Sequence, residues 1–398
     1  MDTDQNVNRE PLVLPETRTL LHLLGCALNS VPAQEKYFQG TDEHLLEELA
    51  KGHMVGAFSG PVCLQAGLVS PETADSWQHT VETGVYKAVL FEAEQDAIEA
   101  LLEENGIAYL PLKGRALNAL YPPKSVRETA DIDILIPASG EEAAYRLMLA
   151  RGYKAETNEG SVCYEREPMY VVELQTDLIQ NYTGEELHRY FSGLFDRAKS
   201  CQERPLRREL SPDDHYLYII AHGYKHYSKQ GIGLRFLCDI YVCCRAWKLD
   251  RAYLDGELKR LKLLDFEREV RELGKKLFDR PGELDEALGC LTPEEENLLK
   301  KLSDAGAFGT FVNQVRWKVK KFAPKAGRMT GAIRARYILY RLFPPPEEMW
   351  KYYTFFDRHR FLTPFLYVYR FYRAFATRWD FVKNEIKALI RTRDLDPS

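Results

Sequence analysis

The sequence has no run of eighteen apolar residues and no Cys-x-x-Cys pair among its eight cysteines. The first absence argues against a membrane-spanning helix, which needs about 20 consecutive apolar residues. The second removes the spacing typical of redox and zinc sites, so the scattered thiols are expected to be buried and reduced. Residues 1–18 also lack the basic start and apolar run of a signal peptide. Together these absences predict a cytoplasmic protein.

Charge is unevenly distributed along a chain of ordinary globular composition. Of 398 residues, 45% are hydrophobic and 28% are charged, and this length allows two or three domains. Residues 311–398 hold 19 Lys and Arg against 7 Asp and Glu, whereas the first 310 residues hold 35 against 52. A basic tail beside an acidic body is typical of a protein with a polyanionic partner, but it also suits docking of one part of the chain on the other.

Hydrophobic periodicity divides the chain into helical regions around a short α/β unit. Apolar residues recur at helical spacing over residues 17–60, and a long helix is expected from Ser70-Pro71 to a stop at Gly106. Strand patterns follow at 107–112, 131–136, 153–157, 161–166 and 169–177, with helices at 115–121 and 141–152. The sequence therefore predicts an α+β fold with a small mixed sheet, in four parts: an N-terminal helical region (1–105), an α/β domain (106–205), a helical domain (206–342) and a basic, aromatic, helical C-terminal segment (343–398).

Two acids stand on one face of an otherwise apolar strand pattern. In Asp131-Ile132-Asp133, the alternation of a strand turns both aspartates one way and Ile132 the other way. Like charges on one strand face repel, so the pair needs a compensating cation. Mg²⁺ (or Mn²⁺) is bound by one or two carboxylates together with substrate phosphate. Glu173, a lone carboxylate in a later strand pattern, is the candidate third ligand.

Lys113 and Gly114 lie where the first strand pattern gives way to a helix. Backbone N–H groups at such a junction favour anions, and glycine lets a phosphate approach the main chain. Arg115 and Arg127 are further cations nearby, so we expect a triphosphate site here. For Arg127, a structural salt bridge to the acidic cluster and a phosphate contact both remain open.

The order of Gly114, Asp131-Ile132-Asp133 and Val172-Glu173-Leu174 resembles that of the polymerase-beta-type nucleotidyltransferase superfamily. The chain is more similar to one branch, the uncharacterised nucleotidyltransferase family, in the blocks LPLKGRALNALYPP, VRETADIDILIP, AHGYKHYS, LRFLCDIYVCC and FPPPEEMW. The resemblance extends from about residue 20 to about residue 380. The chain differs in having Arg115 after the glycine, where the superfamily often has Gly or Ser, and Gln175 where branch members tend to have histidine.

The resemblance implies a nucleotidyltransferase-type catalytic domain over residues 106–205. Asp131, Asp133 and Glu173 would bind Mg²⁺ (or Mn²⁺), and Gly114 would lie against the phosphates of a nucleoside triphosphate such as ATP. The implied reaction moves a nucleoside monophosphate to an acceptor hydroxyl and releases pyrophosphate. The acceptor, whether a small molecule, RNA or protein, stays open. The alternative is a non-catalytic nucleotide- or RNA-binding protein of the same fold.

Two pairs of polar residues stand four apart on predicted helices. His222 and His226 face one side of their helix, but the residues between them lack the glutamate of a zinc-protease helix, so we expect a structural or substrate-facing role rather than zinc binding. Arg235 and Asp239 suit a simple ion pair. The resemblance places all four beside the catalytic unit, which leaves a contact with nucleotide or acceptor open.

Aromatic and basic residues alternate in the C-terminal stretch TPFLYVYRFYRAFATRW. Aromatic side chains at helical spacing indicate core packing more often than ligand binding. RNA binding is the alternative, because aromatic rings stack on bases and cations contact phosphates. The residues concerned are Tyr367, Tyr369, Arg370, Phe371, Tyr372, Arg373, Phe375 and Arg378.

Overall fold

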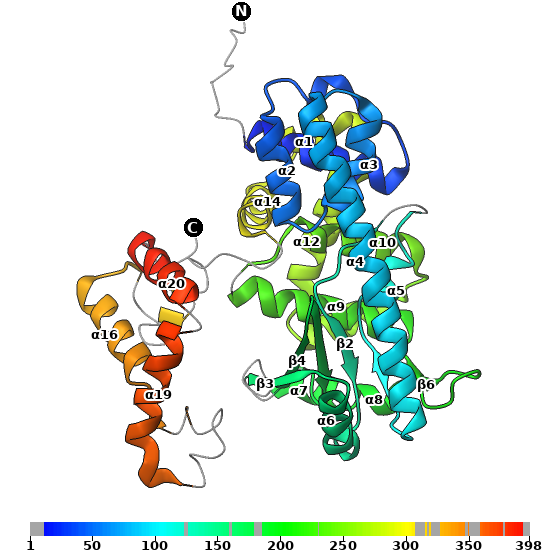
Figure 1. Cartoon of the computed structure of the whole chain (residues 1–398). Coiled ribbons are helices and arrows are strands. Elements are labelled where there is room, and N and C mark those ends of the chain that lie inside the picture. Colours follow the sequence, from blue (N-terminus) through cyan, green and yellow to red (C-terminus); the bar gives the residue numbers. More distant parts are fainter. Residues whose placement is uncertain are drawn as a thin grey trace, which may run out of the picture.

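A five-stranded sheet with helices on both faces forms the centre of the molecule, and further helices extend from it (Figure 1). The computed structural model describes residues 12–122, 126–158, 161–178, 185–229, 231–306, 327–346, 359–376 and 379–392, with residues 315, 316, 318, 319 and 349. Within these residues no helix combines the length and the apolar character needed to cross a bilayer. The predicted α+β class with a small mixed sheet is confirmed.

The N-terminal region is helical, as expected. It consists of α1 (Pro15–Asn29), the 3-10 turn η1 (Glu35–Tyr37), α2 (Glu43–Gly52), α3 (Gly56–Ala66) and α4 (Pro71–Glu104). Ser70 caps α4 by accepting a hydrogen bond from the backbone N–H of Thr73. A glycine brings α3 and α4 together, because a Cβ on Gly84 would lie 2.3 Å from the Cβ of Ala57.

The strands run in the order β1-β2-β5-β4-β3, and β2 and β5 are parallel while the other neighbours are antiparallel. Their bounds are β1 (Leu110–Pro111), β2 (Ile132–Leu135), β3 (Lys154–Asn158), β4 (Ser161–Arg166) and β5 (Tyr170–Gln175). Strand β1 is shorter than the expected 107–112, because Tyr109 exchanges backbone hydrogen bonds with Leu206 and Arg208 instead. Helix α5 (Arg115–Asn118) also falls short of the expected 115–121, since its last turn tightens at Tyr121.

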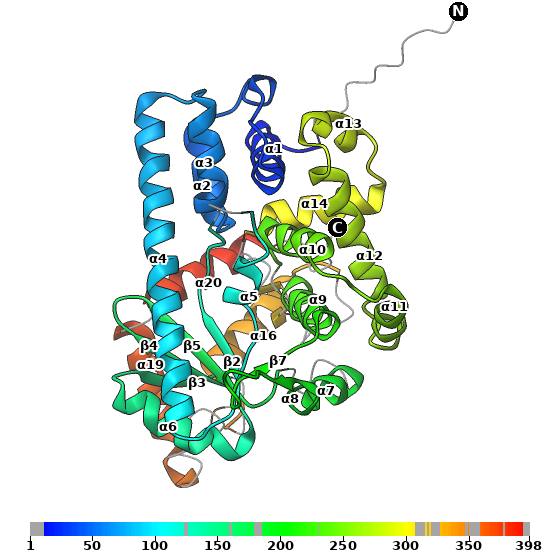
Figure 2. The same ribbon diagram turned by 90° about the vertical axis from the view of Figure 1, so that its right-hand side faces the viewer.

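The two faces of the sheet bury different side chains. Ile132, Ile134 and Ile136 pack on one face in a core shared with α4 and with α6 (Glu141–Ala150), which follows the 3-10 turn η2 (Ala138–Gly140). Leu135, which alternation turns the other way, belongs to the larger core that includes α9 (Pro212–Lys229). The face of β2 that carries Leu135 therefore meets α9. On the other side, α4 runs from the N-terminal helices down to the sheet (Figure 2).

Helices dominate the chain after the sheet. They are α7 (Glu185–Ser192), α8 (Leu194–Arg197), α9, α10 (Leu234–Ala246), α11 (Arg251–Arg260), α12 (Leu264–Phe278), the 3-10 turn η4 (Pro281–Glu283), α13 (Leu284–Gly289) and α14 (Pro293–Ala305), with a small hairpin of β6 (Lys199–Ser200) and β7 (Arg208–Glu209) after α8. The larger core contains side chains from α1 to α3 as well as from α9 to α14. This core contains side chains from both sides of the expected boundaries at 105 and 205. The division into four parts stays a prediction.

The part of the chain after α14 has a small core of its own, to which residues on both sides of the expected boundary at 342 contribute. It contains α16 (Gly331–Leu342), the 3-10 turn η5 (Arg360–Leu362), α19 (Thr363–Ala376) and α20 (Trp379–Arg391). The side chains of Val315, Val319, Tyr337, Ala388 and Leu389 form the core. Helix α16 ends at Leu342, where FPPPEEMW was expected to break the chain. Of the aromatic and basic stretch, the side chains of Tyr372, Arg373, Phe375 and Arg378 lie outside the described part of the structure.

Candidate active site

Asp133 and Glu173 stand directly opposite each other on the parallel strands β2 and β5. Register partners on neighbouring strands project to the same face, with the strands about 4.8 Å apart. Asp131 comes one residue before β2. Burial, and next the charge of Asp131, raise the pKa of both Asp133 and Glu173. The structure thus brings the three predicted acids together.

Gln175 joins the two register partners. Its Nε2 donates hydrogen bonds to Oδ1 of Asp133, at 3.1 Å, and to Oε2 of Glu173, at 2.8 Å. Gln175 is two residues after Glu173 on β5, so both side chains lie on one face. An amide nitrogen carries two hydrogens and can serve both carboxylates at once. This position was noticed in the sequence only as a difference from the related family, yet it orients the acids.

Lys113 is the cation of the cluster. Its Nζ lies 2.8 Å from Oδ2 of Asp133 and 3.0 Å from Nε2 of His222. Burial works against its charge, but the attraction of Asp133 and Asp131 prevails and raises the pKa of Lys113. We therefore describe Lys113 as charged. It was expected at the nucleotide phosphates, and here it lies on the carboxylates instead.

His222 and His226 do face one side of α9, as predicted, and that side covers the acids. Their Nε2 atoms are 2.9 Å apart, and their ring centroids are 4.5 Å apart. Since a charged Lys113 has no lone pair, Nε2 of His222 accepts a hydrogen bond from it. That nitrogen has a single lone pair, so the nearby Nε2 of His226 competes with Lys113 for it. Burial, with the Lys113 charge, lowers the pKa of His222 well below its usual value and that of His226 to about 3.

Two other residues of α9 belong to this face and were missed from the sequence. The hydroxyl of Tyr218 is buried and has no hydrogen-bond partner among the described residues. Burial, followed by the charge of Asp133, raises the pKa of this phenol. Lys225 favours the charged form of Glu173. Tyr218, His222 and Lys225 follow each other at intervals of four and three residues, and that helical spacing is the signal that would have found them.

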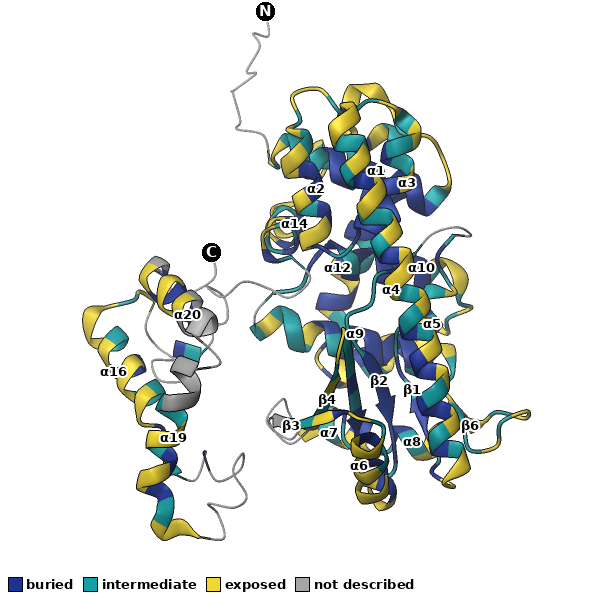
Figure 3. Ribbon diagram, viewed as in Figure 1, coloured by how far each residue is buried: buried dark blue, intermediate teal, exposed yellow. Residues whose placement is uncertain are grey.

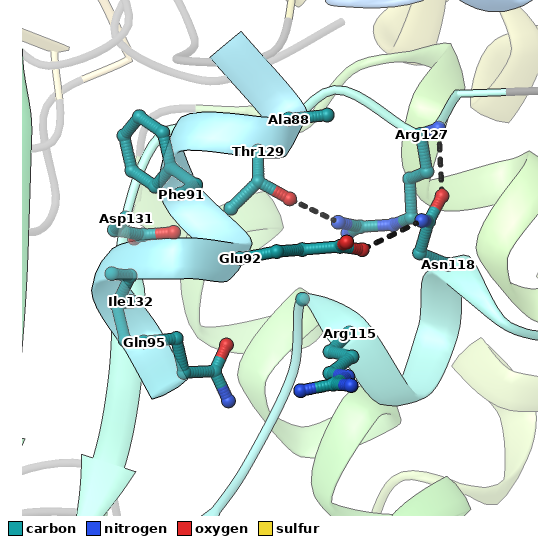
Figure 4. A pocket seen from close by; sticks show the side chains of 11 residues that line it. Ala88, Phe91, Glu92, Gln95, Arg115, Asn118, Arg127, Thr129, Asp131 and Ile132 are labelled. Atoms are coloured by element: carbon teal, nitrogen blue, oxygen red, sulfur yellow. Dashed lines mark hydrogen bonds between the residues drawn. The ribbon is translucent and has the colours of Figure 1, made fainter. Parts of the chain in front are cut away.

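A pocket opens beside the acids, between α4 and the turn at Gly114 (Figure 4). It is lined by Ala88, Phe91, Glu92, Gln95, Gly114, Arg115, Asn118, Arg127, Thr129, Asp131 and Ile132. Gly114 has φ 62° and ψ −106°, a conformation that residues with a Cβ rarely adopt, which explains the glycine. Three of the expected phosphate-binding residues, Gly114, Arg115 and Arg127, therefore share a pocket with Asp131.

Arg127 makes a structural ion pair, although with a partner that was not expected. Its Nε and one terminal nitrogen donate to the two carboxylate oxygens of Asp239, at 2.6 and 2.8 Å, and both side chains are buried. The hydroxyl of Tyr121 donates to the same carboxylate at 2.7 Å. The expected pairing of Arg235 with Asp239 was wrong, because Arg127 occupies Asp239 and Arg235 donates to the carbonyl of Glu128 at 2.7 Å. Among the described residues, Arg127 makes its salt bridge with Asp239 rather than with the acidic cluster.

The metal-ligand arrangement is incomplete in this conformation. Among the described residues, no three His, Cys, Asp or Glu side chains have the geometry to hold a metal ion. Lys113 and Gln175 each contact a carboxylate oxygen of Asp133 that a metal ion would need. Oδ2 of Asp133 lies beside the Lys113 ammonium but accepts no aligned hydrogen bond within the described structure.

The acid cluster and the pocket both lie within a stretch that matches a known family. A family model described as an uncharacterised nucleotidyltransferase matches residues 40–279. The chain belongs to this family. Its match is narrower than the span from about 20 to 380 expected from the sequence blocks, and it ends before FPPPEEMW. Searches of curated proteins and of solved structures gave no match.

Proposed function

We propose that this member of the family is an enzyme that moves a nucleoside monophosphate from a triphosphate, such as ATP, to an acceptor hydroxyl and releases pyrophosphate. The observation that carries the proposal is the convergence of Asp131, Asp133 and Glu173 beside the turn at Gly114. Carboxylates from neighbouring strands can hold the metal ions of nucleotidyl transfer, and a glycine turn before a helix lets a phosphate approach the backbone.

The residues present suit a divalent cation, Mg²⁺ or Mn²⁺. Such ions prefer carboxylate oxygens, and the buried Oδ2 of Asp133 accepts no aligned hydrogen bond among the described residues. Asp131, Asp133 and Glu173 would hold the ion once Lys113 has withdrawn. When bound, such an ion neutralises charge on the attacking and leaving oxygens.

Other residues of the site would bind and orient the triphosphate and the acceptor. The turn at Gly114 lets the phosphates approach the backbone in the pocket beside Asp131. Arg115 pairs with Asp96 at 2.5 Å on the surface, and because an exposed pair contributes little, it is available to the triphosphate. Glu173, whose pKa burial raises, would accept the proton of the acceptor hydroxyl. His222, His226 and Tyr218 cover this side of the acids and would line the acceptor position.

The test is transfer of label from each of the four α-labelled triphosphates in the presence of Mg²⁺ or Mn²⁺ and a cell extract. We expect one triphosphate to label a small molecule, an RNA or a protein, and Asp133→Asn to abolish labelling. Asp255→Asn, on the exposed ion pair with Arg251, is the matched control and should label normally. Binding of nucleotide without any metal-dependent labelling would favour the alternative, a non-catalytic nucleotide- or RNA-binding protein.

We place this reaction in the cytoplasm. All eight cysteines lie in the described structure and none forms a disulfide. A chain with eight free thiols and no disulfide is typical of proteins in a reducing compartment.

A further inference from the structure

Lys113 lies where the proposed cation would bind. Its ammonium is 2.8 Å from Oδ2 of Asp133, and the two side chains are only 15% and 1% exposed. A magnesium ion on the same oxygen would sit about 2.1 Å from it, and therefore within a few ångströms of the ammonium. Two cations at that separation repel strongly in a buried site. Lys113 and the metal ion therefore exclude each other.

A withdrawn ammonium needs a new anion, and the pocket beside Asp131 is a nearby place for one. Lys113 directly precedes the turn at Gly114, which borders the pocket beside Asp131. His222, its other contact, is held neutral by burial and accepts only one hydrogen bond. A triphosphate in the pocket would supply the negative charge that Asp133 gives now.

We propose that Lys113 is an internal counter-ion of the acid cluster, that the divalent cation displaces it, and that the released ammonium pairs with the triphosphate. The inference rests on the proposed function. Its consequence is an order of binding: the metal ion enters together with the nucleotide and not before it, because the nucleotide gives Lys113 another partner.

The test measures metal binding directly, from the loss of the electron paramagnetic resonance signal of free Mn²⁺ on titration with the full chain. The wild type should bind Mn²⁺ weakly alone and at least about tenfold more tightly with a non-hydrolysable triphosphate. Lys113→Met should bind Mn²⁺ about tenfold more tightly than the wild type without nucleotide, and should gain little from it. Lys51→Met, which removes a lysine from the ion pair with buried Glu47, is the matched control and should behave as wild type.

Two variants keep the result interpretable. If Lys113→Met fails to fold, Lys113→Gln retains a hydrogen-bond donor for Asp133 without the charge. Equal Mn²⁺ affinity of the folded Lys113 variant and the wild type overturns the inference, while labelling by the wild type would leave the proposed function standing. Tight Mn²⁺ binding that survives Asp133→Asn in the Lys113→Met background contradicts the proposed acid site itself.

A second observation concerns the C-terminal segment, which exposes an apolar helix face. Phe361, Phe365 and Val368 follow one another at helical spacing along η5 and α19, and they are 78%, 65% and 67% exposed. On α20 the exposed Ile386 and Ile390 alternate with the exposed Lys383 and Lys387. Figure 3 shows exposed positions along α16 and α19. Large apolar side chains exposed at helical spacing in this way favour an interaction site.

We infer that this face binds an anionic membrane surface peripherally. Residues 311–398 carry 19 basic and 7 acidic side chains, so this part of the chain is attracted to acidic lipid headgroups while the exposed apolar side chains of α19 and α20 enter the interface. Single-stranded RNA would use aromatic rings for stacking but would gain nothing from exposed Val368, Ile386 and Ile390. Two copies of a basic segment repel each other, which disfavours self-association.

The test is flotation of the full chain with phosphatidylcholine vesicles, with and without phosphatidylserine. We expect flotation with the serine lipid only, reduced about tenfold or more by the double change Phe365→Glu and Val368→Glu. Val89→Glu, at a 59% exposed position of α4, is the matched control and should float as wild type. Absence of flotation, loss of flotation on addition of single-stranded RNA, or a wild-type dimer that the double change dissociates would overturn the inference.

Discussion

The carboxylates of Asp133 and Glu173 are register partners on parallel strands, and the amide of Gln175 donates a hydrogen bond to each of them. This relationship separates the two acids by role. Asp133 is almost fully buried and contacts Lys113, whereas Glu173 lies at the side that Lys225 approaches. The two acids should therefore respond differently to substitution.

Glu173→Gln should lower kcat about 100-fold or more, because it removes the proposed proton acceptor. A loss of that size corresponds to about 3 kcal/mol of transition-state stabilisation. Asp133→Asn should lower kcat at least as far and should also weaken Mn²⁺ binding, whereas Glu173→Gln should weaken it less. Asparagine is preferred to alanine at 133 because it leaves an acceptor for Lys113. Steady-state rates and Mn²⁺ titrations on the same preparations check this, and equal metal affinity of the two variants would contradict the division of roles.

Gln175→Leu should move the acid limb of the kcat/KM profile to higher pH. The amide donates to the charged forms of both carboxylates, so its loss favours protonation and raises their pKa further. One pH unit corresponds to about 1.4 kcal/mol, and we expect a shift of about that size with a rate loss of about 10- to 100-fold. Gln78→Leu, on the exposed surface of α4 beside Glu82, is the control. An unchanged limb would show that Gln175 does not act on the acids.

Arg127→Met should destabilise the protein by about 3–5 kcal/mol, because it leaves the buried carboxylate of Asp239 without its cation. The double variant with Asp239→Leu should recover much of this loss, since both charges are then absent. Urea unfolding of the single and double variants measures the coupling. A variant of normal stability whose KM for the triphosphate rises would instead assign Arg127 to the phosphates, the role that the sequence left open.

Acid should destabilise the protein because the fold buries His53 in its neutral form. Nδ1 of His53 accepts from the backbone N–H of Leu234 and its Nε2 donates to the carbonyl of Ser303, so a second proton would break one bond. Burial lowers the pKa of His53 to about 4, below the unfolded value near 6.5. The unfolded chain therefore binds the extra proton first, and stability present above about pH 6.5 is lost as the pH falls towards 4.

His53→Gln isolates this contribution. Between pH 8 and pH 5 the wild type should lose about 2 kcal/mol of unfolding free energy through this group, and the variant should lose that much less. Urea unfolding at both pH values provides the measurement. His44→Gln, at an exposed position of α2, is the matched control. If the unfolding free energy of wild type and His53→Gln depends on pH in the same way, protonation of His53 does not control acid stability.

The acids and the glycine were predictable because their signals are local. Asp131, Asp133 and Glu173 stand out as charges in apolar strand patterns, and Gly114 stands at a strand end. The contact of Lys113 with His222 and that of Arg127 with Asp239 were not predictable, because the two partners lie 109 and 112 positions away along the chain. Likewise, β1 is short since Tyr109 pairs with a segment near residue 207, a long-range choice that no local pattern encodes.

Helix α4 spans 34 residues, about 51 Å, and it packs against α3 at one end and against the sheet at the other. Ala88, Phe91, Glu92 and Gln95, on its middle turns, form one wall of the pocket. The close contact at Gly84 fixes this rod to α3 only a turn away from that wall. One continuous helix thus supplies both a wall of the pocket and the contact surface for α3, so the N-terminal helices and the pocket share a single structural support.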